Sequence, residues 1–251
     1  MAGYTHDMTK APGQPQARTA ARENGRPSGA TASPAAPTRV VLRPIGTPLP
    51  LGFLGLFVAT LSFSALQLGW IPADQGRPVA LAALGLTVPV QLVASVLGFL
   101  ARDPVAGTGM GVLAGTWASV GLATLASPPG ATSPGLGIVL VAAGLAMLVP
   151  AAAGRTKTVA ATVMALSAVR FLVTGVAHLG GDAGWMTLAG WTGLLLAAVS
   201  LFAAAAFELE GTDRRQVLPL WRRGPSAAAL TGSGSEQLSD VVHEPGVRQQ
   251  L

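Results

Sequence analysis

Long stretches without any charged residue alternate with short polar segments along the chain. Residues 44–73, 78–101, 104–154 and 183–207 contain no Asp, Glu, Lys or Arg, and 158–181 contains only Arg170 and His178 among polar ionisable residues. A membrane-spanning helix needs roughly 20 apolar residues, and the turn residues of 127–134 (SPPGATSP) divide the longest stretch. The pattern therefore predicts six spanning helices, at about 51–70, 78–100, 106–126, 135–153, 158–180 and 184–207.

The composition agrees with this pattern. Half of the 251 residues are hydrophobic and 11% are charged, and the mean hydropathy is +0.52. A soluble domain usually has about 25% charged residues. We therefore predict an all-α membrane protein with a six-helix domain at 46–210. The tails at 1–45 and 211–251 are rich in small and polar residues, which predicts cytoplasmic segments that are wholly or mostly disordered.

The formal net charge of +5 could indicate a nucleic-acid partner, but the distribution of the basic residues indicates a membrane orientation. With both termini in the cytoplasm, every Lys and Arg except Arg77 and Arg170 lies on the cytoplasmic side or in a cytoplasmic tail. This asymmetry is the positive-inside rule. We predict a multi-pass protein of the cell membrane with both termini cytoplasmic and no nucleic-acid partner.

Polar residues recur on one face of three predicted helices. At 100° per residue, each set below falls within a stripe of roughly 80°. A single Ser, Thr or Gln is more simply explained by a hydrogen bond between helices, but a shared polar lumen explains three stripes together. The stripes are Leu56, Thr60, Ser64 and Gln67; Thr87, Gln91 and Ser95; and Ser167, Arg170, Thr174 and His178.

Arg170 is the most costly of these residues, because it lies about ten residues from either end of its predicted helix. Insertion scales put a central arginine at roughly +2.5–3.5 kcal/mol. No predicted span contains an Asp or Glu that could pair with it. Its partner is therefore a set of backbone carbonyls, lumen water or a transported anion. His178 could respond to protons or serve only as a hydrogen-bonding residue near the membrane surface.

The predicted helix 106–126 has glycines four residues apart on one face, at Gly107, Gly111 and Gly115. Small residues at this spacing let helix backbones approach closely in lipid. We expect this face to make a tight contact, either within a protomer or between protomers.

Catalytic motifs are missing from the predicted spans. They contain no carboxylate pair, no Gly-x-Ser-x-Gly and no His-Glu-x-x-His. The chain has no cysteine, which excludes disulfides, thiol nucleophiles and cysteine-based metal sites. We predict that the protein is not an enzyme and has no metal site and no cofactor, so elimination favours transport.

Four segments resemble a known family of membrane proteins. The segment TPLPLGFLG at 47–55 resembles the Asn-Pro-x-Pro-Leu-Gly-Leu-x-Gly motif that begins the first helix of the acetate uptake transporter family, the acetate and succinate permeases. In the same order, VPVQLVASVLGF (88–99), GTGMGVLAGTW (107–117) and LAGWTGLLLAAVSLF (188–202, followed by RRQVLP) are similar to that family's helices 2, 3 and 6.

The resemblance implies a fold and a function. It implies six helices around a central pore in each protomer, a homo-hexamer, and the lipid bilayer and a small carboxylate as partners. The expected activity is transport of small monocarboxylates such as acetate, with succinate and lactate as further candidates, by a carrier or a channel. The substrate pathway that we predict comprises Pro48, Pro50, Gly52, Leu56, Thr60, Gln91, Ala114, Ser167, Arg170 and Ser200, with the two prolines and Gly52 at the pore entrance.

The chain departs from the family pattern at several of these positions. Thr47 replaces the asparagine of the motif, and Leu56 and Ala114 stand where the family has aromatic residues that narrow the pore. The family typically has an apolar residue at the position of Arg170. These differences predict a wider and more polar lumen with a fixed positive charge.

Two further functions are also compatible with the sequence. Loss of the aromatic constriction at Leu56 and Ala114 favours a non-transporting membrane sensor or assembly protein that keeps the fold. A polar lumen also suits a channel for a small neutral solute such as ammonia, although Arg170 is then unexplained. The polar stripes and Arg170 favour carboxylate transport.

The predicted orientation can be tested on intact cells. Because both tails are expected in the cytoplasm, protease added outside should leave both uncut, as detected by antibodies to a tag at each terminus. Permeabilised cells provide the control in which both tags are lost. Loss of either tag from intact cells would contradict the orientation.

Overall fold

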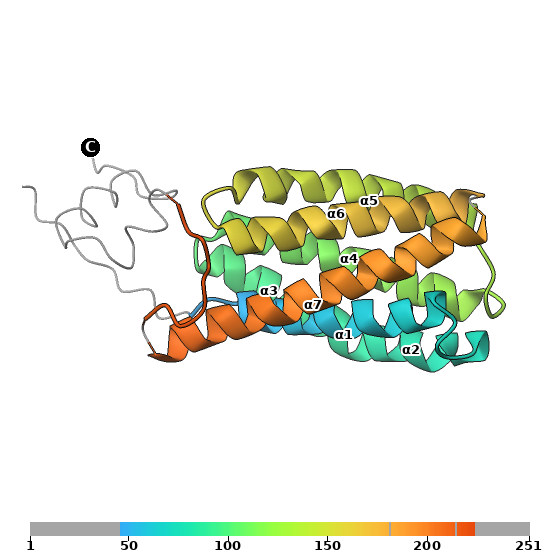
Figure 1. The fold of residues 1–251 in the computed structure, drawn as a ribbon, viewed down its shortest axis with the longest axis horizontal. Helices are drawn as coiled ribbons and strands as arrows, with labels where there is room; N and C mark the ends of the chain where they lie inside the picture. The colour runs from blue at the N-terminus through green and yellow to red at the C-terminus, as the bar shows by residue number, and fades with distance from the viewer. Residues whose placement is uncertain (1–45, 181, 214, 224–251) are drawn as a thin grey trace, which may run out of the picture. The chain divides into compact units, whose positions relative to one another are not determined.

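The computed structural model describes residues 46–180, 182–213 and 215–223, and most of the two predicted tails lies outside these residues. The described chain is helical (Figure 1). Its elements are α1 (Leu49–Gln67), η1 (Ala73–Gln75), α2 (Gly76–Ala82), η2 (Ala83–Thr87), α3 (Val88–Leu100), α4 (Pro104–Ala126), α5 (Pro134–Ala153), α6 (Thr158–Leu179) and α7 (Ala183–Asp213). The elements from η1 to α3 form one continuous helix, Ala73–Leu100. Six helices in the described residues are long and apolar enough to cross a membrane, which confirms the predicted fold class.

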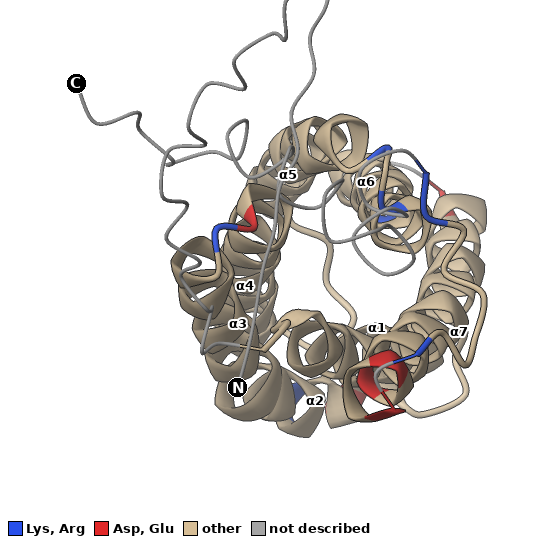
Figure 2. Cartoon of the chain, turned by 90° about the vertical axis from the view of Figure 1, so that its left-hand side faces the viewer, with Lys and Arg blue, Asp and Glu red and all other residues tan. Residues whose placement is uncertain are grey.

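The spanning helices surround a common axis. Contacts run from α1 to α3, α4, α5, α6 and α7 and back to α1, so that they close a ring, as the end-on view in Figure 2 shows. Side chains fill the interior of this ring. The large side chains that are fully buried there include Phe53, Leu56, Met110, Leu113, Leu140, Met147, Met164 and Leu196.

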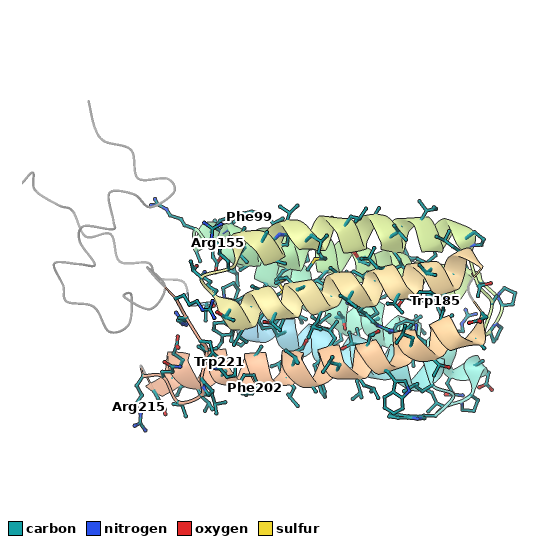
Figure 3. All side chains as sticks on the ribbon, turned by 45° about the horizontal axis from the view of Figure 1, so that its top comes forward. Phe99, Arg155, Trp185, Phe202, Arg215 and Trp221 are labelled. Carbon is teal, nitrogen blue, oxygen red and sulfur yellow. The ribbon has the colours of Figure 1, made fainter. Side chains whose placement is uncertain are left out.

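Charged residues mark one end of the ring, which Figure 2 faces and which we call the basic end. Arg102, Asp103, Lys157, Glu210 and Arg222 line one cavity there. Figure 3 shows Arg155 and Arg215 at this end and Trp185 at the other. The described basic residues that were predicted to be cytoplasmic are therefore gathered at one end of the bundle.

Prolines and capping side chains explain where helices begin. Pro50, Pro104 and Pro134 lie in the first turns of α1, α4 and α5, where no backbone N–H is required. Asp103 accepts a hydrogen bond from the backbone N–H of Ala106 at 3.2 Å and so caps α4. Ser133 caps α5 in the same way, and the predicted turn at 127–134 contains the connection between α4 and α5, which ends where α5 begins at Pro134.

The helix that contains α2 and α3 is interrupted by the π-helical turn η2. Pro89 follows this turn and has no N–H to donate to the carbonyl of Gly85, which explains the loss of the regular α pattern. The turn also makes a contact with α1, because Thr87 Oγ1 donates a hydrogen bond to the carbonyl oxygen of Gly55 at 3.0 Å.

Glycines permit the closest approach between neighbouring helices. A Cβ atom at Gly98 of α3 would lie 2.6 Å from the backbone nitrogen of Gly107 of α4. A Cβ atom at Gly175 of α6 would lie 2.9 Å from the carbonyl oxygen of Gly137 of α5. Backbone atoms cannot move aside as a flexible side chain can, so these two helix pairs require glycine.

The predicted glycine face of α4 is divided between two environments. Gly107 packs against the Phe99 ring, and a Cβ atom at Gly111 would lie 3.0 Å from Ser95 Oγ, so both glycines contact α3 within the protomer. Gly115 is exposed, with nothing within 4 Å of its Cβ position.

The last helix is longer than the apolar pattern predicts, and the chain then returns to the bundle. The sequence predicts an end at about 207 and a tail from 211, whereas α7 continues to Asp213. The segment 208–213 contains the charged residues Glu208, Glu210 and Asp213. These residues are unfavourable in the lipid interior, but they can continue a helix in water. Residues 215–223, which we call the strap, then run back across the basic end.

Hydrogen bonds, a salt bridge and ring contacts hold the strap against the bundle. Thr158 Oγ1 donates to the carbonyl oxygen of Trp221, and the backbone N–H of Arg223 donates to the carbonyl oxygen of Thr156 at 3.0 Å. Arg222 forms a salt bridge with Glu210 of α7, and its Cζ atom lies 5.8 Å from the centre of the Phe207 ring. The strap therefore connects the end of α7 to the beginning of α6.

The contact between α3 and α4 can be tested by adding one methyl group. We expect Gly98→Ala to lower the free energy of unfolding by about 1–3 kcal/mol, because its Cβ atom overlaps backbone atoms of α4. Thermal unfolding in mild detergent, followed by circular dichroism, measures this effect. Gly211→Ala in α7 is the control, since nothing lies within 4 Å of its Cβ position. Equal unfolding midpoints in the two variants would contradict the tight backbone contact.

Candidate functional site

A large cavity begins at the end of the bundle opposite the basic end. It has a volume of about 420 Å³, and residues 128–131, Asp74 and Arg77 line its outer part. It extends inward to Arg170 and Phe171, which lie near the middle of α6. The cavity therefore reaches about halfway through the bundle, and we call it the deep cavity.

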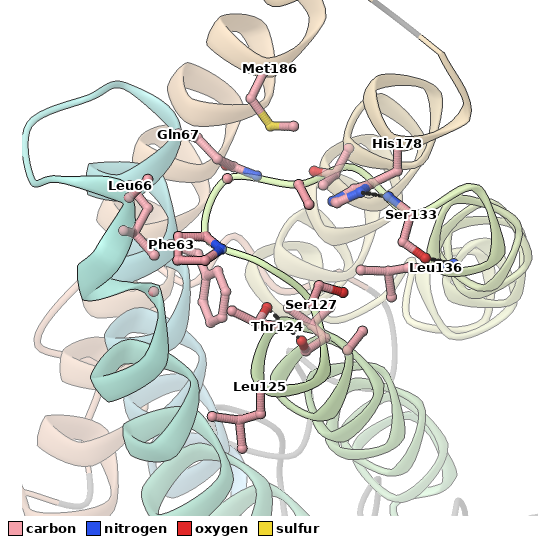
Figure 4. A pocket seen from close by; sticks show the side chains of 18 of the residues that line it. Phe63, Leu66, Gln67, Thr124, Leu125, Ser127, Ser133, Leu136, His178 and Met186 are labelled. Carbon is pink, nitrogen blue, oxygen red and sulfur yellow. Dashed lines mark hydrogen bonds between the residues drawn. The ribbon is translucent and has the colours of Figure 1, made fainter.

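Polar side chains from α1 and α6 face each other across the deep cavity (Figure 4). The Gln67 side chain projects from α1 toward His178 of α6. His178 Nδ1 accepts a hydrogen bond from the backbone N–H of Ser133 at 3.1 Å, which fixes the orientation of the ring. Gln67 Oε1 is buried and has no hydrogen-bond partner.

Three aromatic residues close the inner end of the deep cavity. The Trp117 ring of α4 lies between Phe63 of α1, at a centroid distance of 5.4 Å, and Phe171 of α6, at 6.1 Å. All three are buried and all three line the cavity. Trp117 Nε1 is buried without an acceptor.

Arg170 lies beside this aromatic cluster and is 2% exposed. Its Nη1 atom donates a hydrogen bond to the carbonyl oxygen of Ala189 of α7. The guanidinium group lies against the backbone of Gly193, because a Cβ atom there would be 2.8 Å from Arg170 Cζ. Ser64 Oγ of α1 is closer still to that Cβ position and has no hydrogen-bond partner. Helices α1, α6 and α7 thus meet at Gly193.

The smaller cavity lies at the basic end and has a volume of about 280 Å³. It is lined by Thr47, Pro48, Leu49, Ala101, Arg102, Asp103, Lys157, Phe207, Glu210 and Arg222. Two salt bridges cross this region, Lys157 to Asp103 at 2.6 Å and Arg222 to Glu210. Pro48, predicted to lie at a pore entrance, therefore lines a cavity at the mouth of the bundle.

The interior between the two cavities is packed with side chains. Along α1, Phe53 and Leu56 lie between Leu49 of the smaller cavity and Phe63 of the deep cavity. Along α4, Met110 and Leu113 occupy the corresponding level. These four side chains are fully buried. In this structure the two cavities are therefore separate.

Most of the predicted pathway residues are buried at this intermediate level. Thr60 and Ser167 each bond a carbonyl of their own helix, to Leu56 at 2.6 Å and to Val163 at 2.8 Å. Gln91 Nε2 donates to the carbonyl oxygen of Gly52 at 3.4 Å. The remaining predicted residues that are buried in the ring are Pro50, Gly52, Leu56, Ala114 and Ser200.

Several of the buried polar atoms have no partner within the protein. Besides Ser64 Oγ, Gln67 Oε1 and Trp117 Nε1, these atoms include Gln91 Oε1 and Ser200 Oγ. Unpaired polar groups are costly in an apolar interior, so this series of atoms can pair with a polar solute or with water. No group of three His, Cys, Asp or Glu side chains that could hold a metal ion is found in the described residues.

Sequence reasoning missed the aromatic cluster and Gly193. The chain lacks aromatic residues at Leu56 and Ala114, but Phe63 and Trp117 follow on the same helices, two turns and one turn further along. An aromatic residue in an apolar span carries no periodic signal that separates an interior position from a lipid-facing one. The pairing of Gly193 with Arg170 depends on how α6 and α7 pack, which a single helix does not reveal.

Comparisons with known proteins support the fold. The chain matches no family model and no curated protein. Its structure is similar to that of the bacterial acetate channel SatP, with a TM-score of 0.64 and 20% sequence identity over 70% of this chain and 99% of that chain. The resemblance inferred from the sequence is thereby confirmed at the level of the fold. The chain is a multi-pass all-α membrane protein with the architecture of a bacterial acetate channel.

Proposed function

We propose that this protein transports small monocarboxylates such as acetate through the centre of each protomer. The observation that carries this proposal is the series of buried, unpaired polar atoms inside the bundle, from Gln67 of the deep cavity and Ser64 to Gln91 and Ser200. A solute that carries its own hydrogen-bonding groups can pair with these atoms. The likeness to an acetate channel supports a small anion as that solute.

The proposed pathway begins in the deep cavity and passes Arg170. It continues past Thr60, Ser167 and Ser200 and reaches the smaller cavity near Pro48. Leu56 and Met110 lie between the cavities, so passage requires these side chains to move. Such movement is compatible with either a channel or a carrier, and succinate and lactate are further candidate substrates.

We also propose an orientation for this pathway in the cell membrane. Arg102, Lys157 and Arg222 line one cavity, and Arg77 lies at the other end of the bundle. By the positive-inside rule the basic end faces the cytoplasm. The deep cavity then opens to the outside, and both termini are cytoplasmic.

The packed interior favours a second candidate function. A protein that senses a carboxylate without transporting it needs the deep cavity but no connection between the cavities. Leu56, Met110 and Leu113 block such a connection in this structure. Flux measurements distinguish this candidate from a transporter.

Transport can be tested with radiolabelled acetate in proteoliposomes. The unaltered protein should raise acetate uptake above that of empty liposomes, and Ser200→Ala should lower this flux about three- to tenfold, the effect of one lost hydrogen bond. Ser119→Ala is the matched control, because Ser119 is partly exposed and bonds only its own helix. Uptake no faster than in empty liposomes would contradict transport and favour the sensor.

A homo-hexamer is the proposed assembly, with Gly115 on the exposed face of α4 as a candidate for close contact between protomers. Native mass spectrometry in mild detergent should give six copies of the chain. Gly115→Leu should shift the distribution toward smaller species, while Gly211→Leu, at the end of α7, should not. A preparation that contains only monomers and dimers would argue against the hexamer.

A further inference from the structure

We propose that Arg170, Ser64 and Trp117 form a binding site for one small monocarboxylate at the inner end of the deep cavity. This inference rests on the proposed function, because it identifies the residues that first bind the transported solute. Each of the three residues comes from a different helix, α6, α1 and α4. Each is at least nine-tenths buried, and two of them have an unpaired polar atom.

The guanidinium group of Arg170 supplies a positive charge that no carboxylate of the described residues neutralises. No carboxylate contacts Arg170 among the described residues, and its hydrogen bond goes to the carbonyl oxygen of Ala189. That oxygen also accepts a hydrogen bond from Thr192 Oγ1 at 3.0 Å. A guanidinium group has five N–H donors, so most of its donors remain available to a ligand. Asp74, the carboxylate that lines the same cavity, lies in its outer part.

Gly193 of α7 fixes the position of this charge beside Ser64. Arg170 Nε would lie 2.9 Å from a Cβ atom at Gly193, and Ser64 Oγ would also overlap that atom. Because residue 193 is glycine, the guanidinium group and the Ser64 hydroxyl share one small region against the α7 backbone. The hydroxyl has no partner there and can donate to an anion bound at Arg170.

Trp117 supplies a second uncharged donor. Trp117 stacks against Phe63 and Phe171, which are the chain neighbours of Ser64 and Arg170. This packing brings the indole ring to the same level of the bundle as the other two residues. Its Nε1–H group has no acceptor in the protein, and an indole N–H can only donate.

The chemistry of the site identifies the ligand class. A guanidinium group binds a carboxylate through two parallel hydrogen bonds, and uncharged donors strengthen the interaction. The walls formed by Phe63 and Phe171 suit a short apolar tail. One buried cation balances one negative charge, so a second carboxylate on the ligand would enter this apolar region without a partner. A small monocarboxylate therefore fits better than a dicarboxylate.

Binding can be measured without transport. Purified full-length protein in mild detergent and low-chloride buffer is titrated with sodium acetate, sodium succinate, sodium chloride and acetamide, with isothermal calorimetry as the readout. Acetamide has the size of acetate but no charge. We expect acetate to bind at least tenfold more tightly than succinate, chloride or acetamide. Equal affinities for acetate and acetamide, or for acetate and chloride, would overturn the proposed site.

Variants then locate the binding. Arg170→Gln should weaken acetate binding at least tenfold, whereas Arg170→Lys should retain part of it, because the charge remains but the paired geometry is lost. Trp117→Phe and Ser64→Ala should each weaken binding about three- to tenfold through one lost donor. Arg155→Gln, the same substitution at an exposed position of the basic end, should leave binding unchanged.

The outcomes separate this site from the proposed function. If Arg170→Gln fails to fold, the Trp117→Phe and Ser64→Ala variants still test the site, because both keep the positive charge of Arg170. Unchanged acetate affinity in these two variants would remove Ser64 and Trp117 from the site and overturn it. Binding that depends on Arg170 without any flux in proteoliposomes would support the site and contradict transport. Acetate flux in proteoliposomes, together with acetate binding that Arg170→Gln leaves unchanged, would support transport and contradict the site.

Discussion

Lipid offers no hydrogen-bond partners, and this constraint determines where each polar side chain of the bundle lies. Thr60, Ser167 and Thr174 satisfy it within their own helix, since each hydroxyl donates to the carbonyl four residues earlier. Thr87 and Ser95 satisfy it across helices and thereby fix α1 and α4 against η2 and α3. Ser64 Oγ, Gln91 Oε1 and Ser200 Oγ remain unpaired and are buried inside the ring.

Arg170 is the extreme case of the same constraint. An arginine at the centre of a span costs roughly 2.5–3.5 kcal/mol on insertion scales, and the carbonyl of Ala189 offsets only part of this cost. The group keeps its position because α7 has a glycine at 193, where any side chain would collide with the guanidinium group and with Ser64. One glycine thus both allows α6, α7 and α1 to meet and leaves space for the charge.

The sequence predicts the spans well because a segment of about 20 apolar residues without charge is rarely anything but a membrane span. It also places Thr60, Gln91, Ser167 and Arg170 inside the bundle, since polar residues in spans seldom face lipid. The end of α7 is displaced, because apolar composition identifies where a helix leaves the membrane and not where it stops.

Contacts between helices are harder to derive from sequence. The cluster of Phe63, Trp117 and Phe171 joins three helices, and neither its members nor their partners repeat with a helical period. Gly98 and Gly175 likewise resemble any other glycine of an apolar span until the opposing backbone is known. Pro89 is an exception, because its missing N–H is visible in the sequence and accounts for the irregular turn before α3.

The strap has a mechanical consequence for the bundle. It attaches the end of α7 to the first turn of α6 at Thr158, and Arg170 attaches the same two helices 12 residues further along, a separation of about 18 Å at 1.5 Å per residue. A single attachment would act as a pivot, but two attachments at this distance resist both sliding and rotation. We therefore expect α6 and α7 to keep their relative position when the interior of the ring widens.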